Sequence, residues 1–143
     1  MKKQFGFGLA ALVASGLVSF APVMAQDLAN DEASLNLLIE EGETVYTTYC
    51  SACHGVNGEG GGGPALDNST MVNSRSATIF QILFGATDHG MPAFAPMLDD
   101  RQVAAVSTYI RNAWSNEGTI VLPRSVELRR SEGAPPEAET DAQ

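Results

Sequence analysis

The chain has 143 residues, of which 17 are acidic and 8 are basic, so its formal net charge at neutral pH is −9. A surface this acidic disfavours binding to nucleic acid or to anionic membranes and favours a protein partner that presents a basic docking patch. Ordinary solubility explains the same charge equally well, so composition alone does not select a function.

The first 25 residues have the pattern of a secretory signal peptide. Lys2 and Lys3 precede an apolar run from Phe5 to Phe20, and residues 23–25 place compact side chains at the cleavage position. We therefore expect cleavage after Ala25 and a periplasmic mature chain of about 118 residues, the size of one small domain. The alternative is an uncleaved anchor, because residues 4–26 carry no charge. No second long apolar run follows, so we expect no transmembrane span in the mature chain.

Residues 26–34 are polar and acidic and are expected to form a flexible lead. A helical stripe follows, in which residues recur at offsets of three, four and seven: Leu35, Leu38, Ile39, Gly42, Val45, Tyr46 and Tyr49. The unusual member is Gly42, because a glycine costs about 1 kcal/mol in a helix interior relative to alanine. Close approach of a second helix across this face would explain it, and a tolerated surface glycine is the alternative.

Both cysteines of the chain lie in the segment Cys50-Ser51-Ala52-Cys53-His54, directly after this predicted helix. The C-x-x-C-H spacing is the attachment signature of c-type haem. Two thiols three positions apart can each form a thioether bond with one vinyl group, and the histidine then reaches the iron as its proximal axial ligand. We therefore predict one covalent haem c, held by Cys50 and Cys53, with His54 as an iron ligand.

Two other kinds of site use the same residue types. A dithiol redox site would place Cys-x-x-Cys near a βαβ pattern, but the flanking segments have the patterns of a helix and a glycine-rich loop. A zinc site normally needs four Cys or His ligands, and only His89 remains outside the motif. Haem attachment explains the segment better than either alternative.

Residues 55–63 contain six glycines and lead into Pro64-Ala65-Leu66. A phosphate-binding loop would need a preceding strand, a following helix, and a lysine with a serine or threonine at fixed places, and this pattern is missing. Backbone lying close to a flat ligand explains the glycines better.

Two more helices are predicted downstream. Ser76 is expected to cap a short helix that ends at Gly85, and Asp99 with Gln102 resembles a capping box before a last helix that reaches Trp114. Residues 119–122 form the one β-like run and are too isolated to count as a strand. The paired prolines and four acids of residues 131–143 predict a disordered acidic tail.

An electron carrier usually has both axial positions of its iron filled, and a thioether raises the potential relative to a second imidazole. The downstream candidates for the second ligand are Met71, His89, Met91 and Met97. Met91 is favoured, because Gly90 allows close backbone approach and Pro92 stiffens the loop. The other methionines would then be packing residues and His89 a solvated loop residue. If none of the four binds, the iron is open to small ligands or peroxide.

With these motifs in this order, residues 35–116 resemble a class I monohaem c-type cytochrome. The resemblance implies that the carbonyl of Pro64 accepts a hydrogen bond from His54, which fixes the tautomer of the imidazole and strengthens its donation to iron. It also implies that Met91 is the second axial ligand. The candidate site residues are therefore Cys50, Cys53, His54, Pro64 and Met91.

The terminal helices of the domain resemble the same family. The resemblance implies that Gly42 and Tyr46 of the first helix cross Val106 and Tyr109 of the last. Residues 106–116 are similar to helices in cytochrome subunits and domains of periplasmic dehydrogenases that oxidise alcohols and sugars, and residues 126–130 resemble a short extension seen there. Those relatives often carry several haems, whereas this chain has one attachment motif.

We therefore predict an all-α cytochrome c fold, with three to five short helices enclosing one covalent haem c, followed by an extension over residues 117–130. The protein is expected to move single electrons and to perform no bond chemistry. Expected partners are a dehydrogenase or quinol-oxidising complex as donor and a terminal oxidase or reductase as acceptor. A dedicated subunit of a periplasmic oxidoreductase and a ligand-binding or peroxidatic haem protein are the alternatives.

Overall fold

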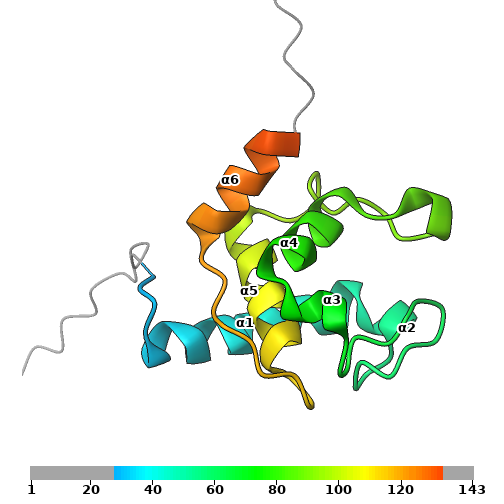
Figure 1. The fold of residues 1–143 in the computed structure, drawn as a ribbon, viewed down its shortest axis with the longest axis horizontal. Helices are drawn as coiled ribbons and strands as arrows, with labels where there is room; N and C mark the ends of the chain where they lie inside the picture. Colours follow the sequence, from blue (N-terminus) through cyan, green and yellow to red (C-terminus); the bar gives the residue numbers. More distant parts are fainter. Residues whose placement is uncertain (1–27, 134–143) are drawn as a thin grey trace, which may run out of the picture.

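A computed structural model describes residues 28–133, which contain six α-helices, one short 3-10 helix and no strand. The elements are α1 (Glu32–Tyr49), α2 (Ser51–His54), α3 (Thr70–Asn73), α4 (Arg75–Phe84), η1 (Thr87–His89), α5 (Asp100–Asn112) and α6 (Pro123–Gly133). The predicted all-α class is confirmed. The helices outnumber the three to five expected, because the segment after α5 forms α6, which packs against α4 and α5 (Figure 1).

The central contact of the fold joins α1 and α5, which cross near the middle of the molecule (Figure 1). A Cβ atom at Gly42 would lie 2.1 Å from the carbonyl oxygen of Ala105 and 2.7 Å from the Cβ of Tyr109, so only glycine permits this approach. Tyr46, one turn later, is buried, and its ring centroid lies 5.4 Å from that of Tyr109. The predicted helix crossing is therefore confirmed, with Ala105 rather than Val106 closest to Gly42.

Local capping chemistry sets the ends of α4 and α5. The predicted capping box of α5 is confirmed: the side chain of Asp99 accepts from the amide of Gln102 at 2.8 Å, and the side chain of Gln102 accepts from the amide of Asp99 at 3.0 Å. The predicted end of α4 at Gly85 is also confirmed, but its cap is Ser74 rather than Ser76. Ser74 has the extended backbone of a cap residue because it joins α4 to the preceding α3.

The first helix begins earlier than the apolar stripe indicates. The side chain of Asp31 caps α1 by accepting from the amide of Ser34 at 2.8 Å, so residues 32–34, expected in the flexible lead, are helical. The predicted signal peptide, residues 1–25, lies outside the described residues. Within the described part of the chain, none of the helices has both the length and the apolar character needed to cross a bilayer.

The residues after α5 turn back along it and end in α6. The hydroxyl of Thr108 and the backbone of Val121 exchange hydrogen bonds of 2.9 and 3.3 Å, and the side chains of Val121 and Val126 are fully buried. Helix α6 continues to Gly133, so the prediction of disorder is wrong for residues 131–133. Packing of Val126 in the core stabilises this polar helix, and composition alone could not reveal that contact. Residues 134–143 of the predicted tail lie outside the described residues.

The helix crossing predicts a large effect of Gly42→Val on stability. The added side chain would overlap the backbone of α5, so we expect the free energy of unfolding to fall by about 3 kcal/mol or more. Denaturant unfolding of the haem-loaded protein measures this change. Asn36→Ala, at an exposed position of the same helix, is the matched control and should change stability by no more than about 0.5 kcal/mol. Equal effects of the two substitutions would contradict the close crossing.

Candidate haem site

The Cys-x-x-Cys-His segment continues from the C-terminal end of α1 as the short helix α2. The amide of Cys50 donates to the carbonyl of Tyr46 at 2.9 Å, and the amide of His54 donates to the carbonyl of Cys50 at 3.0 Å. Cys50 and Cys53 are free cysteines about one helical turn apart. Burial raises the pKa of the Cys50 thiol to about 11, which argues against a reactive dithiol at neutral pH.

The imidazole of His54 is buried and held in one orientation, with 9% of the residue exposed. Its Nδ1 lies 2.8 Å from the carbonyl oxygen of Pro64. Because a carbonyl oxygen can only accept a hydrogen bond, Nδ1 carries the proton in this contact. The other nitrogen, Nε2, then has a lone pair available for a metal. The structure thus contains the hydrogen bond that the resemblance implies.

The glycine-rich loop folds back onto α2 through backbone hydrogen bonds. The amide of Gly60 donates to the carbonyl of His54, and the amide of Gly63 donates to the carbonyl of Cys53, both at 2.8 Å. The hydroxyl of Tyr46 donates to the carbonyl of Gly55 at 2.6 Å and so ties the end of α2 to α1. These bonds satisfy carbonyl groups that a four-residue helix leaves unpaired, and they hold the loop against the motif.

Met91 lies in a loop that its own backbone closes. The amide and carbonyl of Met91 pair with the backbone of Ala86 at 3.1 and 3.0 Å, on either side of η1. Gly85 lets this loop approach the end of α4, because a Cβ atom there would lie 2.5 Å from the carbonyl oxygen of Pro92. The Nε2 of Gln81 donates to the sulfur of Met91 at 3.4 Å. The methionine is therefore held through both its backbone and its side chain.

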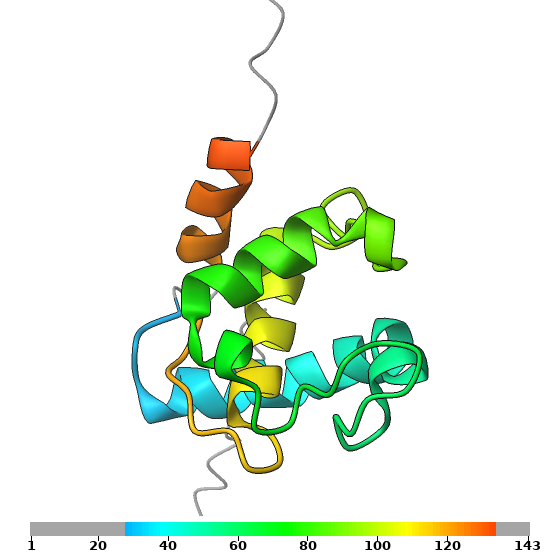
Figure 2. The same ribbon diagram turned by 45° about the vertical axis from the view of Figure 1, so that its right-hand side comes forward.

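The loop that carries Met91 and the helix that carries the attachment motif lie at the same end of the molecule. Both ribbon views show α4 leading into η1 on one side of this end, with α2 and the glycine-rich loop on the other (Figures 1 and 2). The other candidate ligands are less constrained: Met71 and Met97 are 40 and 52% exposed, and His89 is exposed in η1. Among the four candidates, Met91 is the one whose side chain has a hydrogen-bond partner within residues 28–133.

The donor set fits a c-type haem. Two free thiols one turn apart would serve as covalent attachment points, and the buried imidazole and the restrained thioether are side chains of the kind that cytochromes use as axial ligands. Tyr49 and Val56, which flank the motif, are 43 and 74% exposed. Apolar surface beside the motif is therefore open to contact with a flat apolar group.

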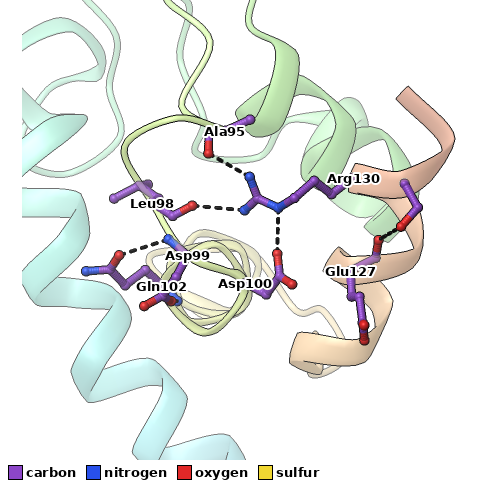
Figure 3. A network of polar contacts seen from close by, with 8 residues as sticks. Ala95, Leu98, Asp99, Asp100, Gln102, Glu127 and Arg130 are labelled. Carbon is purple, nitrogen blue, oxygen red and sulfur yellow. Dashed lines mark hydrogen bonds and ion pairs between the residues drawn. The ribbon is translucent and has the colours of Figure 1, made fainter. Parts of the chain in front are cut away.

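Two side chains that contact Met91 or the chain that follows it were not predicted from the sequence. Gln81 contacts the sulfur of Met91, and its one sequence signal is that it is a polar residue within an apolar helix. Arg130 of α6 donates to the carbonyls of Ala95 and Leu98, which follow Met91 in the same loop (Figure 3). Both contacts join different elements of the fold, so neither periodicity nor spacing reveals them.

The bond from Tyr46 to Gly55 predicts the effect of Tyr46→Phe. The change leaves a carbonyl without its donor and should lower the free energy of unfolding by about 1 kcal/mol. Burial raises the pKa of Tyr46 to about 12, whereas an unfolded tyrosine titrates near pH 10, so the stability that this phenol contributes is complete below about pH 10 and is lost as the pH rises towards 12. The deficit of the variant should shrink over that range.

Denaturant unfolding as a function of pH measures both effects. Tyr49→Phe is the matched control, because Tyr49 is 43% exposed and follows Tyr46 in the same helix. A deficit in Tyr46→Phe no larger than that of the control would show that the bond to Gly55 does not stabilise the motif.

Comparisons with known proteins agree with this geometry. The profile of the family described as "Cytochrome C oxidase, cbb3-type, subunit III" matches residues 38–110. The chain is 33% identical over 120 residues to cytochrome c6 of Thermosynechococcus vestitus, which covers 77% of this chain and 91% of that protein. It is 31% identical over 81 residues to the cbb3-type cytochrome c oxidase subunit CcoP of Azospirillum brasilense, covering 51% of this chain and 28% of that subunit. It is also 36% identical over 84 residues to the quinohemoprotein alcohol dehydrogenase ADH-IIG of Pseudomonas putida, covering 58% of this chain and 11% of that enzyme.

The matched region contains the attachment motif, the glycine-rich loop and the Met91 segment. The chain spans most of cytochrome c6 but less than a third of the CcoP subunit and a smaller share of the alcohol dehydrogenase. The all-helical fold and the family match together show that the chain belongs to the class I c-type cytochromes, electron-transfer proteins with a covalently bound haem c.

Proposed function

We propose that the protein is an exported one-electron carrier whose haem iron is bound by His54 and Met91 and whose porphyrin is attached to Cys50 and Cys53. The observation that carries this proposal is the 2.8 Å hydrogen bond from Nδ1 of His54 to the carbonyl of Pro64, which leaves Nε2 for the iron. When bound, the haem supplies an iron that accepts and releases one electron.

Groups that contact the proposed ligands would adjust the potential of a bound iron. The carbonyl of Pro64 fixes the ring orientation of His54 and would strengthen the donation of its Nε2 to a bound iron. The amide of Gln81 draws electron density from the sulfur of Met91 through the 3.4 Å contact. The buried side chains Phe94 and Leu98 line the core beside the Met91 loop and keep its surroundings apolar. These residues adjust a potential and perform no bond chemistry.

Redox proteins are the proposed partners. A dehydrogenase or quinol-oxidising complex would donate the electron, and a terminal oxidase or reductase would accept it. Similarity to an oxidase subunit and to an alcohol dehydrogenase supports this assignment, and the net charge of −9 favours a basic docking patch on the partner. The signal-like residues 1–25 support export to the periplasm.

A dedicated subunit of a periplasmic oxidoreductase is the second candidate, because the chain is also similar to the CcoP subunit of a cbb3-type oxidase. Low-salt purification from the native host, with covalent haem followed by its peroxidase stain on a denaturing gel, separates the two functions. A larger chain that co-purifies in fixed ratio supports the subunit. A haem-bearing monomer free of other chains supports the carrier.

Met91→Ala tests the proposed ligand set. The variant should keep its covalent haem, lose the absorption band of the sulfur–iron bond and bind carbon monoxide when reduced. Its potential should fall by on the order of 100 mV, a fraction of the roughly 0.8 V over which axial ligands set haem potentials. Met97→Ala removes an exposed methionine nearby and should change none of these properties. If the spectrum of Met91→Ala were unchanged, the second iron ligand would be another of the candidate residues.

Gln81→Leu tests the second contact of the sulfur. Loss of the hydrogen bond makes the thioether a better donor to ferric iron, so the potential should fall by about 40 mV, which corresponds to a bond worth about 1 kcal/mol for one electron. Redox titration measures the shift. Adding Gln81→Leu to Met91→Ala provides the control, because the effect should disappear when the sulfur is absent. An equal shift in both backgrounds would show that Gln81 acts on the iron without the methionine.

A further inference from the structure

The arginines of the described residues fall into two groups of three. Each arginine of the first group forms an ion pair with a carboxylate; this group is Arg101, Arg129 and Arg130. The arginines of the second group line one cavity of about 570 Å³; this group is Arg75, Arg111 and Arg124. Within residues 28–133, no acidic side chain lines this cavity. We call it the arginine cavity.

Arg111 is the inner wall of the arginine cavity and is 4% exposed. Its guanidinium donates to the backbone oxygens of Val72 and Thr119 and to the hydroxyl of Thr119. All three acceptors are neutral, so its charge has no counter-charge among its hydrogen-bond partners in the described structure. A buried charge without an opposite charge is costly. Arg75 is close enough to add to this cost, because burial and the charge of Arg75 together lower the pKa of Arg111.

The cavity lies between elements that do not carry the haem motif. Its walls come from Asn30 before α1, the junction of α3 and α4, the last turn of α5, and residues 119–125. Arg75 and Arg124 are exposed at its rim, and Asn73, Thr119 and Ser125 add neutral polar groups. One buried and two exposed guanidinium groups therefore border one space, and among the described residues no carboxylate borders it.

We propose that the arginine cavity binds a small phosphate-class oxyanion. Guanidinium groups match such anions well, because their planar N–H pairs form two parallel hydrogen bonds to neighbouring oxygens. The net charge of −9 repels anions from the rest of the surface, and it disfavours an anionic bilayer as the source of the phosphate. Free oxyanion is therefore the expected occupant.

Phosphate titration of the full-length, haem-loaded protein tests the proposal. Calorimetry in chloride buffer of constant ionic strength gives the dissociation constant, and thermal unfolding gives the stabilisation on binding. Arg75→Gln and Arg124→Gln change exposed residues of the cavity, and we expect each to weaken phosphate binding by about tenfold. Arg129→Gln removes the same charge outside the cavity and should bind as the wild type does. Absence of binding to the wild type, or equal losses in all three variants, would overturn the proposal.

Vesicles of phosphatidylglycerol separate the two sources of a phosphate group. Co-sedimentation that free phosphate competes away, and that Arg124→Gln abolishes, would support the cavity with a lipid headgroup as its ligand. Phosphate binding without co-sedimentation would support the free anion. Co-sedimentation that Arg75→Gln and Arg124→Gln leave unchanged, in a protein that does not bind free phosphate, would overturn the site.

A different set of contacts leads from α6 to the Met91 loop. The guanidinium of Arg130 donates to the carbonyls of Ala95 and Leu98 at 2.6 and 2.9 Å and to the carboxylate of Asp100 at 2.7 Å (Figure 3). The amide of Ala95 also donates to the carbonyl of Leu83 in α4 at 3.0 Å. The chain that follows Met91 is thus held between α4, α5 and α6.

We infer that Arg130 is a positioning residue for Met91, an inference that rests on the proposed ligation of iron by that methionine. The bonds of Arg130 to Ala95 and Leu98 hold the chain that follows Met91 in place, and this restrains Met91 to one position. Without it, two backbone carbonyls lose their donor, and the loop opens more often. Opening would expose the sixth position of the iron to added ligands.

The rate of carbon monoxide binding to the reduced, haem-loaded protein tests this role. Arg130→Gln should raise the rate about tenfold at neutral pH, because the rate follows the population of the open loop. Arg130→Lys keeps the positive charge but lacks the planar set of N–H donors of a guanidinium group. It should give an intermediate rate of carbon monoxide binding. Arg129→Gln, on the same helix, should match the wild type.

Equal rates in Arg130→Gln and Arg129→Gln would overturn the positioning role, provided that Met91→Ala loses the sulfur–iron band. Retention of that band in Met91→Ala would instead overturn the proposed ligand set, and the role of Arg130 with it. The two failures are therefore distinguishable.

Discussion

Where α1 crosses α5, Gly42 brings the two helix backbones together, and the carbonyl oxygen of Ala105 occupies the place that a side chain would need. This contact fixes the direction in which α1 ends, and the attachment motif continues from that end as α2. Tyr46 extends the contact, since its ring packs against Tyr109 while its hydroxyl holds the carbonyl of Gly55. The position of the motif thus depends on a helix contact about two turns away.

The two halves of the proposed haem site are restrained in different ways. The half that carries His54 is restrained by contacts close in sequence, because the glycine-rich loop folds directly back onto α2. The half that carries Met91 is restrained by α4 through Gln81 and by α6 through Arg130. The C-terminal extension therefore forms part of the support of the second proposed ligand. A shorter chain without α6 would lack that support.

Contacts between residues close in the sequence could be predicted from it, whereas contacts between distant residues could not. The capping box of Asp99 and Gln102 joins residues three positions apart, and it was predicted correctly. The cap of α4 was misplaced from Ser74 to Ser76, because both residues have cap chemistry and only the preceding helix selects between them. Helix α6 was missed, because its stability comes from Val126 in the core and from Arg130, not from periodicity.

Local patterns by themselves predicted the attachment of haem c, the helical class and the capping box of α5. The reason is that thioether attachment, capping and helical periodicity each act within a few residues of the chain. Local patterns left the role of Gly42 open, and only the resemblance implied the helix crossing there. The tertiary structure alone decided the contact of Gln81 with Met91, the three bonds of Arg130 and the gathering of three arginines around one cavity. Each of these joins elements that are separate in the chain, and hydrogen-bond distances and burial exist only once the helices have packed.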